Sequence, residues 1–148
     1  MSRCRIREFE MTTDEARGAS ELRLVLTTSD YDAALTLYRD VLGLAQIADY
    51  SAPTGRVVVL AAGRATIELA DEGHAAYVDT VEVGRRVAGP VRIAFEVADV
   101  RGRTEALGQS GATIVAAPTQ TPWNTLNARL VGTDGIQLTL FGPLDAVS

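Results

Sequence analysis

This chain of 148 residues has no lysine, one cysteine and one histidine, and only 5% of its residues are aromatic. Its fourteen basic residues are all arginines, which excludes a lysine Schiff base or a lysine general base. A single cysteine, Cys4, forms no intrachain disulfide, and we interpret it as an incidental thiol in a reducing compartment. Chemistry that needs several histidines, cysteines or lysines is therefore unavailable.

Basic charge and long apolar runs are also missing. The formal net charge of -5 argues against nucleic acid as a partner, because phosphates are bound by basic surfaces. No apolar run reaches the roughly 18 residues of a membrane span, so we expect no membrane partner. Residues 1–20 are polar, without the apolar segment of a signal peptide, and we expect a flexible tail in which Met1 or Met11 is the native start. These features favour a cytoplasmic protein.

The same order of segments occurs twice along the chain. Residues 21–70 and 91–143 each begin with an apolar strand, an aspartate and an amphipathic helix, and each continues with several strand-like runs. We expect two similar modules in one α+β domain, joined by a connector at 71–90 and followed by a short tail at 144–148. Two curved half-sheets placed side by side would enclose a central cavity.

The first predicted helix follows Asp30 or Ser29, either of which can cap its free N–H groups. Helical spacing places six side chains on one buried stripe, and Gly43 provides the left-handed stop. The stripe consists of Tyr31, Ala34, Leu35, Tyr38, Val41 and Leu42.

The second predicted helix follows Asp99, carries Val100, Thr104 and Leu107, and ends at Gly111. Residues 71–90 form a long connector that is partly packed, and we interpret it as a binding loop, a lid or a bridge to a second subunit. The predicted strands are Leu22–Thr28, Gln46–Tyr50, Val57–Ala61, Ala65–Ala70, Arg92–Val97, Ala112–Ala117, Leu126–Val131 and Ile136–Phe141, with a loop at Pro118–Asn124 and a hairpin turn at Asp134–Gly135.

Four strands alternate between two kinds of side chain. One row is apolar and is expected to pack under the two helices; it holds Leu22, Leu24, Leu26, Ile67, Leu69, Ile93, Phe95, Val97, Ile136, Leu138 and Leu140. The opposite row mixes charged and small residues, and it either faces solvent or lines the cavity. This row holds Arg23, Val25, Thr27, Thr66, Glu68, Ala70, Arg92, Ala94, Glu96, Gln137, Thr139 and Phe141.

The sequence resembles the vicinal oxygen chelate superfamily of glyoxalases, bleomycin-resistance proteins and extradiol dioxygenases. The resemblance covers about Glu21–Pro143. It rests on the strand leading to Asp30, Ala34–Leu44 (ALTLYRDVLGL), Arg92–Val100 (ending in VADV), Pro122–Asn124 (PWN), and Thr133–Gly135 (TDG) with the last strand. It implies paired βαβββ modules that form a curved mixed sheet, in a homodimer that binds a small molecule.

Metalloenzymes of this superfamily place their ligands at four equivalent positions, in the first and last strand of each module. Here these positions hold Arg23, Glu68, Arg92 and Thr139. Only Glu68 is a competent metal ligand, because an arginine has no lone pair to donate. The resemblance therefore points to a metal-free branch that needs no cofactor.

Two roles are open for the charged residues at these positions. Arg23 and Arg92 could converge on Glu68 as a structural ion-pair cluster that braces the two modules. Alternatively, one guanidinium is free to hold a carboxylate, phosphate or enolate through a two-pronged hydrogen bond, and Glu68 is a candidate general base.

Other candidate ligand-binding residues lie near the end of the chain. Trp123 offers either a stacking surface at a pocket mouth or a loop anchor, and Asn124 offers directional hydrogen bonds. Phe141 is a further aromatic candidate, with Tyr50, Tyr77 and Asn127 as weaker ones. The only histidine, His74, lies in the connector, where an incidental role outweighs a catalytic one.

Three functions are consistent with this sequence. The first is a metal-free protein that binds a small molecule and sequesters an antibiotic or an anionic metabolite. The second is a glyoxalase-like lyase, isomerase or dioxygenase-related enzyme, using Glu68 as a base or a divergent metal site. The third is an accessory protein whose pocket has collapsed. The shared fold does not choose among them.

Overall fold

The computed structural model describes residues 18–133 and 135–145. Among these residues, no helix has the length and apolar character needed to cross a membrane. Outside the described residues lie most of the expected N-terminal tail with Met1, Cys4 and Met11, then Asp134 of the predicted hairpin turn, and residues 146–148.

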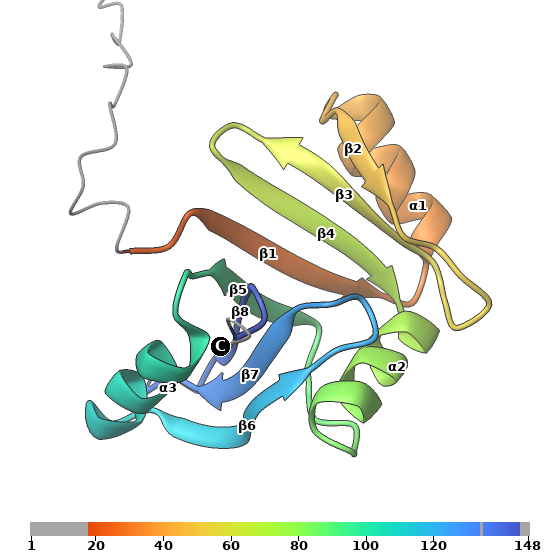
Figure 1. The fold of residues 1–148 in the computed structure, drawn as a ribbon. Helices are drawn as coiled ribbons and strands as arrows, with labels where there is room; N and C mark the ends of the chain where they lie inside the picture. Colours follow the sequence, from red (N-terminus) through yellow and green to blue (C-terminus); the bar gives the residue numbers. More distant parts are fainter. Residues whose placement is uncertain (1–17, 134, 146–148) are drawn as a thin grey trace, which may run out of the picture.

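The eight described strands form one curved sheet in the order β2-β3-β4-β1-β5-β8-β7-β6 (Figure 1). Each half is one βαβββ module: β1 runs parallel to β4, and β5 runs parallel to β8. Antiparallel pairing of β1 with β5 joins the two halves, and this confirms the predicted fold. The strands are β1 (Glu21–Thr28), β2 (Gln46–Asp49), β3 (Val57–Ala62), β4 (Ala65–Asp71), β5 (Val91–Glu96), β6 (Thr113–Gln120), β7 (Leu126–Val131) and β8 (Gln137–Gly142).

Each module has its own apolar core beneath its helix. In the first module, α1 (Tyr31–Leu35) packs Tyr31 against Val58, Leu60 and Leu69. In the second, Val100 of α3 (Val100–Gln109) packs against a cluster from β7 and β8: Leu126, Ala128, Leu130 and Leu140. The predicted aspartate caps are confirmed, since Asp30 accepts from Ala33 N and Asp99 accepts from Gly102 N.

The first helix departs from the predicted stripe after Leu35. It continues as a π-helix, η2 (Thr36–Val41), in which Leu42 N donates to Leu37 O. Wider π winding rotates later side chains away from the 3.6-residue spacing, so the predicted burial of Val41 and Leu42 is wrong. Val41 is 75% exposed and Leu42 is 63% exposed. Gly43 supplies the predicted left-handed stop with φ 84°.

The connector contains a helix, α2 (Glu72–Glu82), which the sequence analysis did not predict. Asp71 caps it by accepting from His74 N and also accepts from Arg56 N, so the start of α2 is tied to β3. Figure 1 shows α2 on the open side of the curved sheet, between its two halves, whereas α1 and α3 lie outside. This helix contacts β1, β4 and β7 and therefore covers the hollow.

The predicted loop at 118–124 is shorter in the structure, because β6 continues through Pro118 to Gln120. A proline is tolerated there because β6 is an edge strand and its pairing with β7 shifts register between Ala116 and Thr119.

Candidate functional site

A cavity of about 660 Å³ lies between the mixed row of the sheet, α2 and the loop before β7. Of the two roles left open for the mixed row, cavity lining holds for half of its residues: Arg23, Glu68, Arg92, Ala94, Thr139 and Phe141. The pocket is open, so the interpretation of a collapsed pocket is wrong. The lining residues are Arg23, Tyr50, Ser51, Ala52, Thr54, Val57, Glu68, His74, Tyr77, Val78, Glu82, Arg92, Ala94, Pro122, Trp123, Thr125, Asn127, Thr139 and Phe141.

The four equivalent strand positions meet on the cavity floor, in two pairs. Arg23 Nη1 donates to Glu68 Oε1 at 3.3 Å, between β1 and β4. Arg92 Nη1 donates to Thr139 Oγ1 at 2.5 Å, between β5 and β8. The convergence of both arginines on Glu68, one of the two arrangements left open by the sequence, does not occur: the Arg23–Glu68 pair is ionic and the Arg92–Thr139 pair is not.

Arg23 is fully partnered. Its Nη2 donates to both oxygens of Glu21 at 3.1 Å, and its guanidinium lies 5.3 Å from the centre of the Phe141 ring. Burial opposes the charge, but Glu68 and Glu21 outweigh it and raise the pKa of Arg23. Thr66 Oγ1 also donates to Glu21 at 2.7 Å, so this side of the floor is a closed ionic network.

Arg92 is buried without a matching carboxylate. It is 8% exposed, and its guanidinium forms no ion pair with any carboxylate of residues 18–133 or 135–145. Burial lowers the pKa of Arg92, because desolvation outweighs the attraction of the more distant carboxylates of Glu82, Glu68 and Asp79. Among the described residues, one partner is found for its five N–H donors, the hydroxyl group of Thr139, which leaves donors for a ligand.

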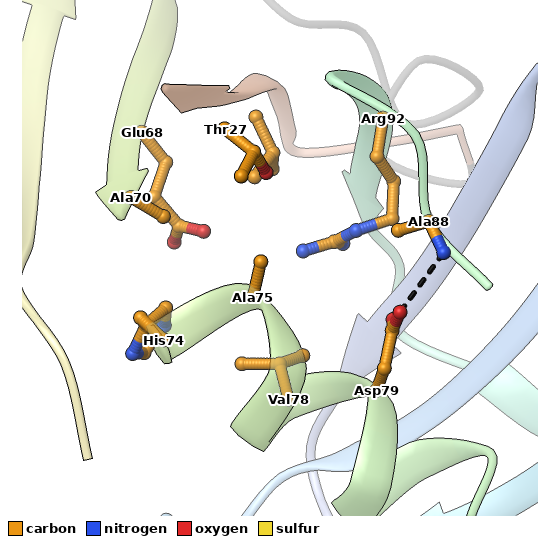
Figure 2. A pocket seen from close by; sticks show the side chains of 10 residues that line it. Thr27, Glu68, Ala70, His74, Ala75, Val78, Asp79, Ala88 and Arg92 are labelled. Carbon is orange, nitrogen blue, oxygen red and sulfur yellow. Dashed lines mark hydrogen bonds between the residues drawn. The ribbon is translucent and has the colours of Figure 1, made fainter. Parts of the chain in front are cut away.

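Figure 2 shows Glu68 and Arg92 pointing toward one another over α2, with His74, Ala75 and Val78 beneath them. Both residues line the large cavity and a narrow interstice of about 10 Å³ beside it. A cation and a carboxylate therefore share the floor without touching. A ligand placed between them would meet a donor group on one side and an acceptor on the other.

A second ionic cluster holds α2 against β7. Arg129 is completely buried; its Nη1 donates to Asp79 Oδ1 at 2.8 Å and its Nη2 donates to Glu82 Oε2 at 2.7 Å. Asn127 Nδ2 donates to Glu82 Oε1 at 2.7 Å. Burial alone would raise the pKa of Asp79, but backbone N–H groups of Val87 and Ala88 and the two arginines Arg129 and Arg86 lower it to about 2.

The sequence analysis missed this cluster, although a signal existed. Asn127 and Arg129 alternate with apolar residues in a strand of two-sided burial, and a buried arginine needs acidic partners. Asp79 and Glu82 are three residues apart, which places both on one face of a helix. Without a predicted helix in the connector, these two observations could not be joined.

The aromatic candidates form one wall of the cavity. The ring centres of Tyr77 and Trp123 are 6.2 Å apart, and those of His74 and Tyr77 are 6.4 Å apart. Burial lowers the pKa of His74, and its buried Nδ1 has no hydrogen-bond partner in residues 18–133 and 135–145. Asn124 is outside the residues that line the cavity and has a left-handed φ of 64°, so its structural role is to form the turn.

The residues present do not fit a transition metal. Of the four equivalent positions only Glu68 offers an anionic ligand, and one carboxylate beside the weak neutral hydroxyl of Thr139 is too few ligands for a transition metal. In the described part of the chain, no three histidine, cysteine, aspartate or glutamate side chains are grouped to hold an ion.

The fold and the cavity place this chain in the class of proteins built from paired βαβββ modules, in which two modules share one sheet and enclose a cavity. The sequence profile of the Glyoxalase/Bleomycin resistance protein/Dioxygenase superfamily matches residues 22–140, and this chain belongs to that superfamily. Among curated protein sequences, none matches this chain.

Solved structures share the fold at low sequence identity. A superfamily member from Vibrio splendidus 12B01 has a TM-score of 0.61 at 15% identity, over 82% of this chain and 97% of that chain. Methylmalonyl-CoA epimerase from Mycobacterium tuberculosis has a TM-score of 0.61 at 18% identity, over 92% of this chain and 94% of that chain. A variant of the Streptomyces coelicolor methylmalonyl-CoA epimerase in complex with 2-nitronate-propionyl-CoA has a TM-score of 0.61 at 18% sequence identity, over 86% of this chain and 99% of that chain. At these identities the similarity establishes the fold alone.

Proposed function

We propose that this protein binds a small organic anion in the cavity, without a metal, and that Arg92 and Thr139 hold its acidic group. The observation that carries the proposal is the buried Arg92 guanidinium, which has one hydroxyl partner and no ion pair within the described residues. An unpaired buried cation is costly, and a bound carboxylate or phosphate would offset that cost through charge-assisted hydrogen bonds.

The rest of the cavity supports a ligand with an apolar body. Its volume of about 660 Å³ lies within the range of small-molecule sites. Apolar side chains of Val57, Val78 and Ala94 also line the cavity. An antibiotic or a metabolite that carries an acidic group matches this arrangement, and sequestration requires no chemistry beyond binding.

The test compares acids with their neutral analogues by calorimetry. Benzoate and cyclohexanecarboxylate are titrated beside the corresponding amides, and we expect the acids to bind at least about tenfold more tightly. Arg92→Gln should remove that preference, while the exposed Arg101→Gln, which breaks only a surface pair with Asp145, should keep it. Equal binding of acids and amides, or an unchanged Arg92→Gln, would contradict the proposal.

A second candidate function is proton transfer, because the Glu68 carboxylate faces Arg92 across the floor (Figure 2). Glu68 would remove a proton from a carbon next to a carbonyl group, Arg92 would stabilise the enolate oxygen, and the proton would return to carbon. Two of the structures with this fold are methylmalonyl-CoA epimerases, which is consistent with such a step.

Deuterium uptake distinguishes an enzyme from a binding protein. In D₂O, an enzyme of this kind exchanges the hydrogen next to the ligand's carbonyl, and NMR follows its loss. In an enzyme, Glu68→Gln would stop that exchange. A binding protein shows no exchange, either as the wild type or as Glu68→Gln. Elemental analysis after addition of Ni²⁺, Zn²⁺ or Fe²⁺ tests the metal-free part of the proposal, which stoichiometric metal would contradict.

A further inference from the structure

We infer that the anion bound in this cavity is an aromatic acid, whose carboxylate meets Arg92 while its ring lies against Tyr77 and Trp123. This inference rests on the proposed function and narrows its ligand class. It is carried by an aromatic wall and a polar floor that line the same cavity.

One part of the wall belongs to α2. His74, Tyr77 and Val78 follow i, i+3 and i+4 spacing, so one face of the helix presents two rings and an aliphatic side chain to the cavity. The rings of His74 and Tyr77 are tilted by 54° and do not stack face to face, which leaves ring surface for a third aromatic group. Burial lowers the pKa of His74 and so favours the neutral imidazole.

The other part of the wall is Trp123, which a short turn before β7 holds in place. Thr121 and Thr125 close the turn: Thr121 N donates to Thr125 O at 2.9 Å, and their hydroxyl groups are 2.9 Å apart. Asn124 N donates to Thr121 O at 3.1 Å, and its left-handed backbone completes the turn. Trp123 lines the cavity yet stays 42% exposed, so ring surface remains for a ligand to cover.

The wall and the floor are fixed relative to each other. Arg129 ties Asp79 and Glu82 of α2 to β7, and β7 pairs directly with β8, which carries Thr139. The aromatic wall therefore needs no rearrangement to meet a ligand that is anchored on Arg92. A rigid site of this kind gains affinity because less conformational freedom is lost on binding.

The chemical class of the ligand follows from the polar floor and the aromatic wall of the cavity. The floor offers unused guanidinium donors, which select an acid, and the wall offers aromatic faces, which select a planar ring over a saturated one. Phe141, the other ring at the floor, lies beneath the Arg23 guanidinium and is less available.

The experiment compares 2-naphthoate with decahydro-2-naphthoate, which has the same carboxylate and carbon skeleton but no aromatic ring. Calorimetry should show the aromatic acid binding about three- to tenfold more tightly. Trp123→Leu keeps an apolar side chain and should reduce the ratio to nearly one, while Trp123→Phe keeps a ring and should retain most of it. Circular dichroism and Tm show whether each variant is folded.

The outcomes separate this inference from the proposed function. If both acids bind through Arg92 with equal affinity, the aromatic class is wrong and the anion site stands. If neither acid binds, the proposed function fails and the inference fails with it. A preference for 2-naphthoate that Trp123→Leu leaves intact would also overturn the inference, because the ring would then lie elsewhere. Trp123 is the only tryptophan in the chain, so a change in its fluorescence on adding decahydro-2-naphthoate reports cavity occupation by a non-fluorescent ligand.

Discussion

The interior of this protein has two regions built around a buried arginine, and they differ in how its charge is met. Between α2 and β7, Arg129 donates to two carboxylates, Asp79 and Glu82. Between β5 and β8, Arg92 has one acceptor in the described part of the chain, the hydroxyl group of Thr139. A saturated ion cluster can only hold the fold together, whereas an unsaturated guanidinium beside a cavity has donors left for a ligand. The surroundings, and not the residue type, separate a structural from a binding arginine.

The strongest contrast is expected from replacing each arginine by methionine. Arg129→Met leaves two buried carboxylates without a cation and should lower the free energy of unfolding by about 3–5 kcal/mol. Arg92→Met removes an unpaired buried charge and should change stability by less than about 1 kcal/mol while abolishing acid binding. Urea unfolding and calorimetry measure the two effects. Similar stability losses in both variants would contradict the comparison.

Acid should weaken the α2–β7 cluster through Asp79. Its carboxyl pKa is about 2 in the folded protein against an ordinary 3.8, so folding favours the ionised form. Its contribution, about 2 kcal/mol, is present above pH 3.8 and is lost as pH falls toward 2. Urea midpoints at pH 5 and pH 3 should therefore differ more in the wild type than in Asp79→Asn, and an equal difference would exclude this carboxyl as a cause.

A smaller effect is expected from Glu68→Gln on the cavity floor. The substitution removes a negative charge that faces Arg92, and it should tighten benzoate binding by about threefold. Arg23 keeps Glu21 as a partner, so the fold should tolerate the change. Weaker binding in Glu68→Gln would mean that Glu68 helps to orient the ligand or Arg92. Titration calorimetry at low ionic strength makes the change largest.

Dimer formation is expected to have the smallest effect on acid binding at Arg92. The exposed apolar side chains of Val41, Leu42 and Ile47, on η2, at its end and on β2, offer a surface that a second chain could cover. We expect light scattering at micromolar concentration to give the mass of two chains, with acid affinity nearly unchanged on dilution to monomer. A monomeric mass at that concentration would contradict the dimer. A large loss of affinity on dilution would mean that the partner chain contributes to the site.

Much of the fold could be predicted because its signals are local. Alternation places Leu26 and Ile67 beneath the first helix and Glu68 and Thr139 in the cavity, and Asp30 and Asp99 mark the helix starts. The burial of Val41 was mispredicted because 3.6-residue spacing does not describe a π-helix.

The candidate site was predicted less completely. Arg23, Arg92, Trp123 and Phe141 do line the cavity, but the sequence left open which arginine is paired. Asn124, which was grouped with them, serves the turn that presents Trp123.

The sequence by itself determined the two modules and the face of each strand, because these depend on side-chain periods of two and 3.6 residues. Only the tertiary structure decided where charge is cancelled. Asp79 and Arg129 are 50 residues apart and meet because α2 folds over the sheet. Coulomb attraction and hydrogen bonding depend on separations of a few ångströms, so the partners of a buried arginine are set by how distant elements pack.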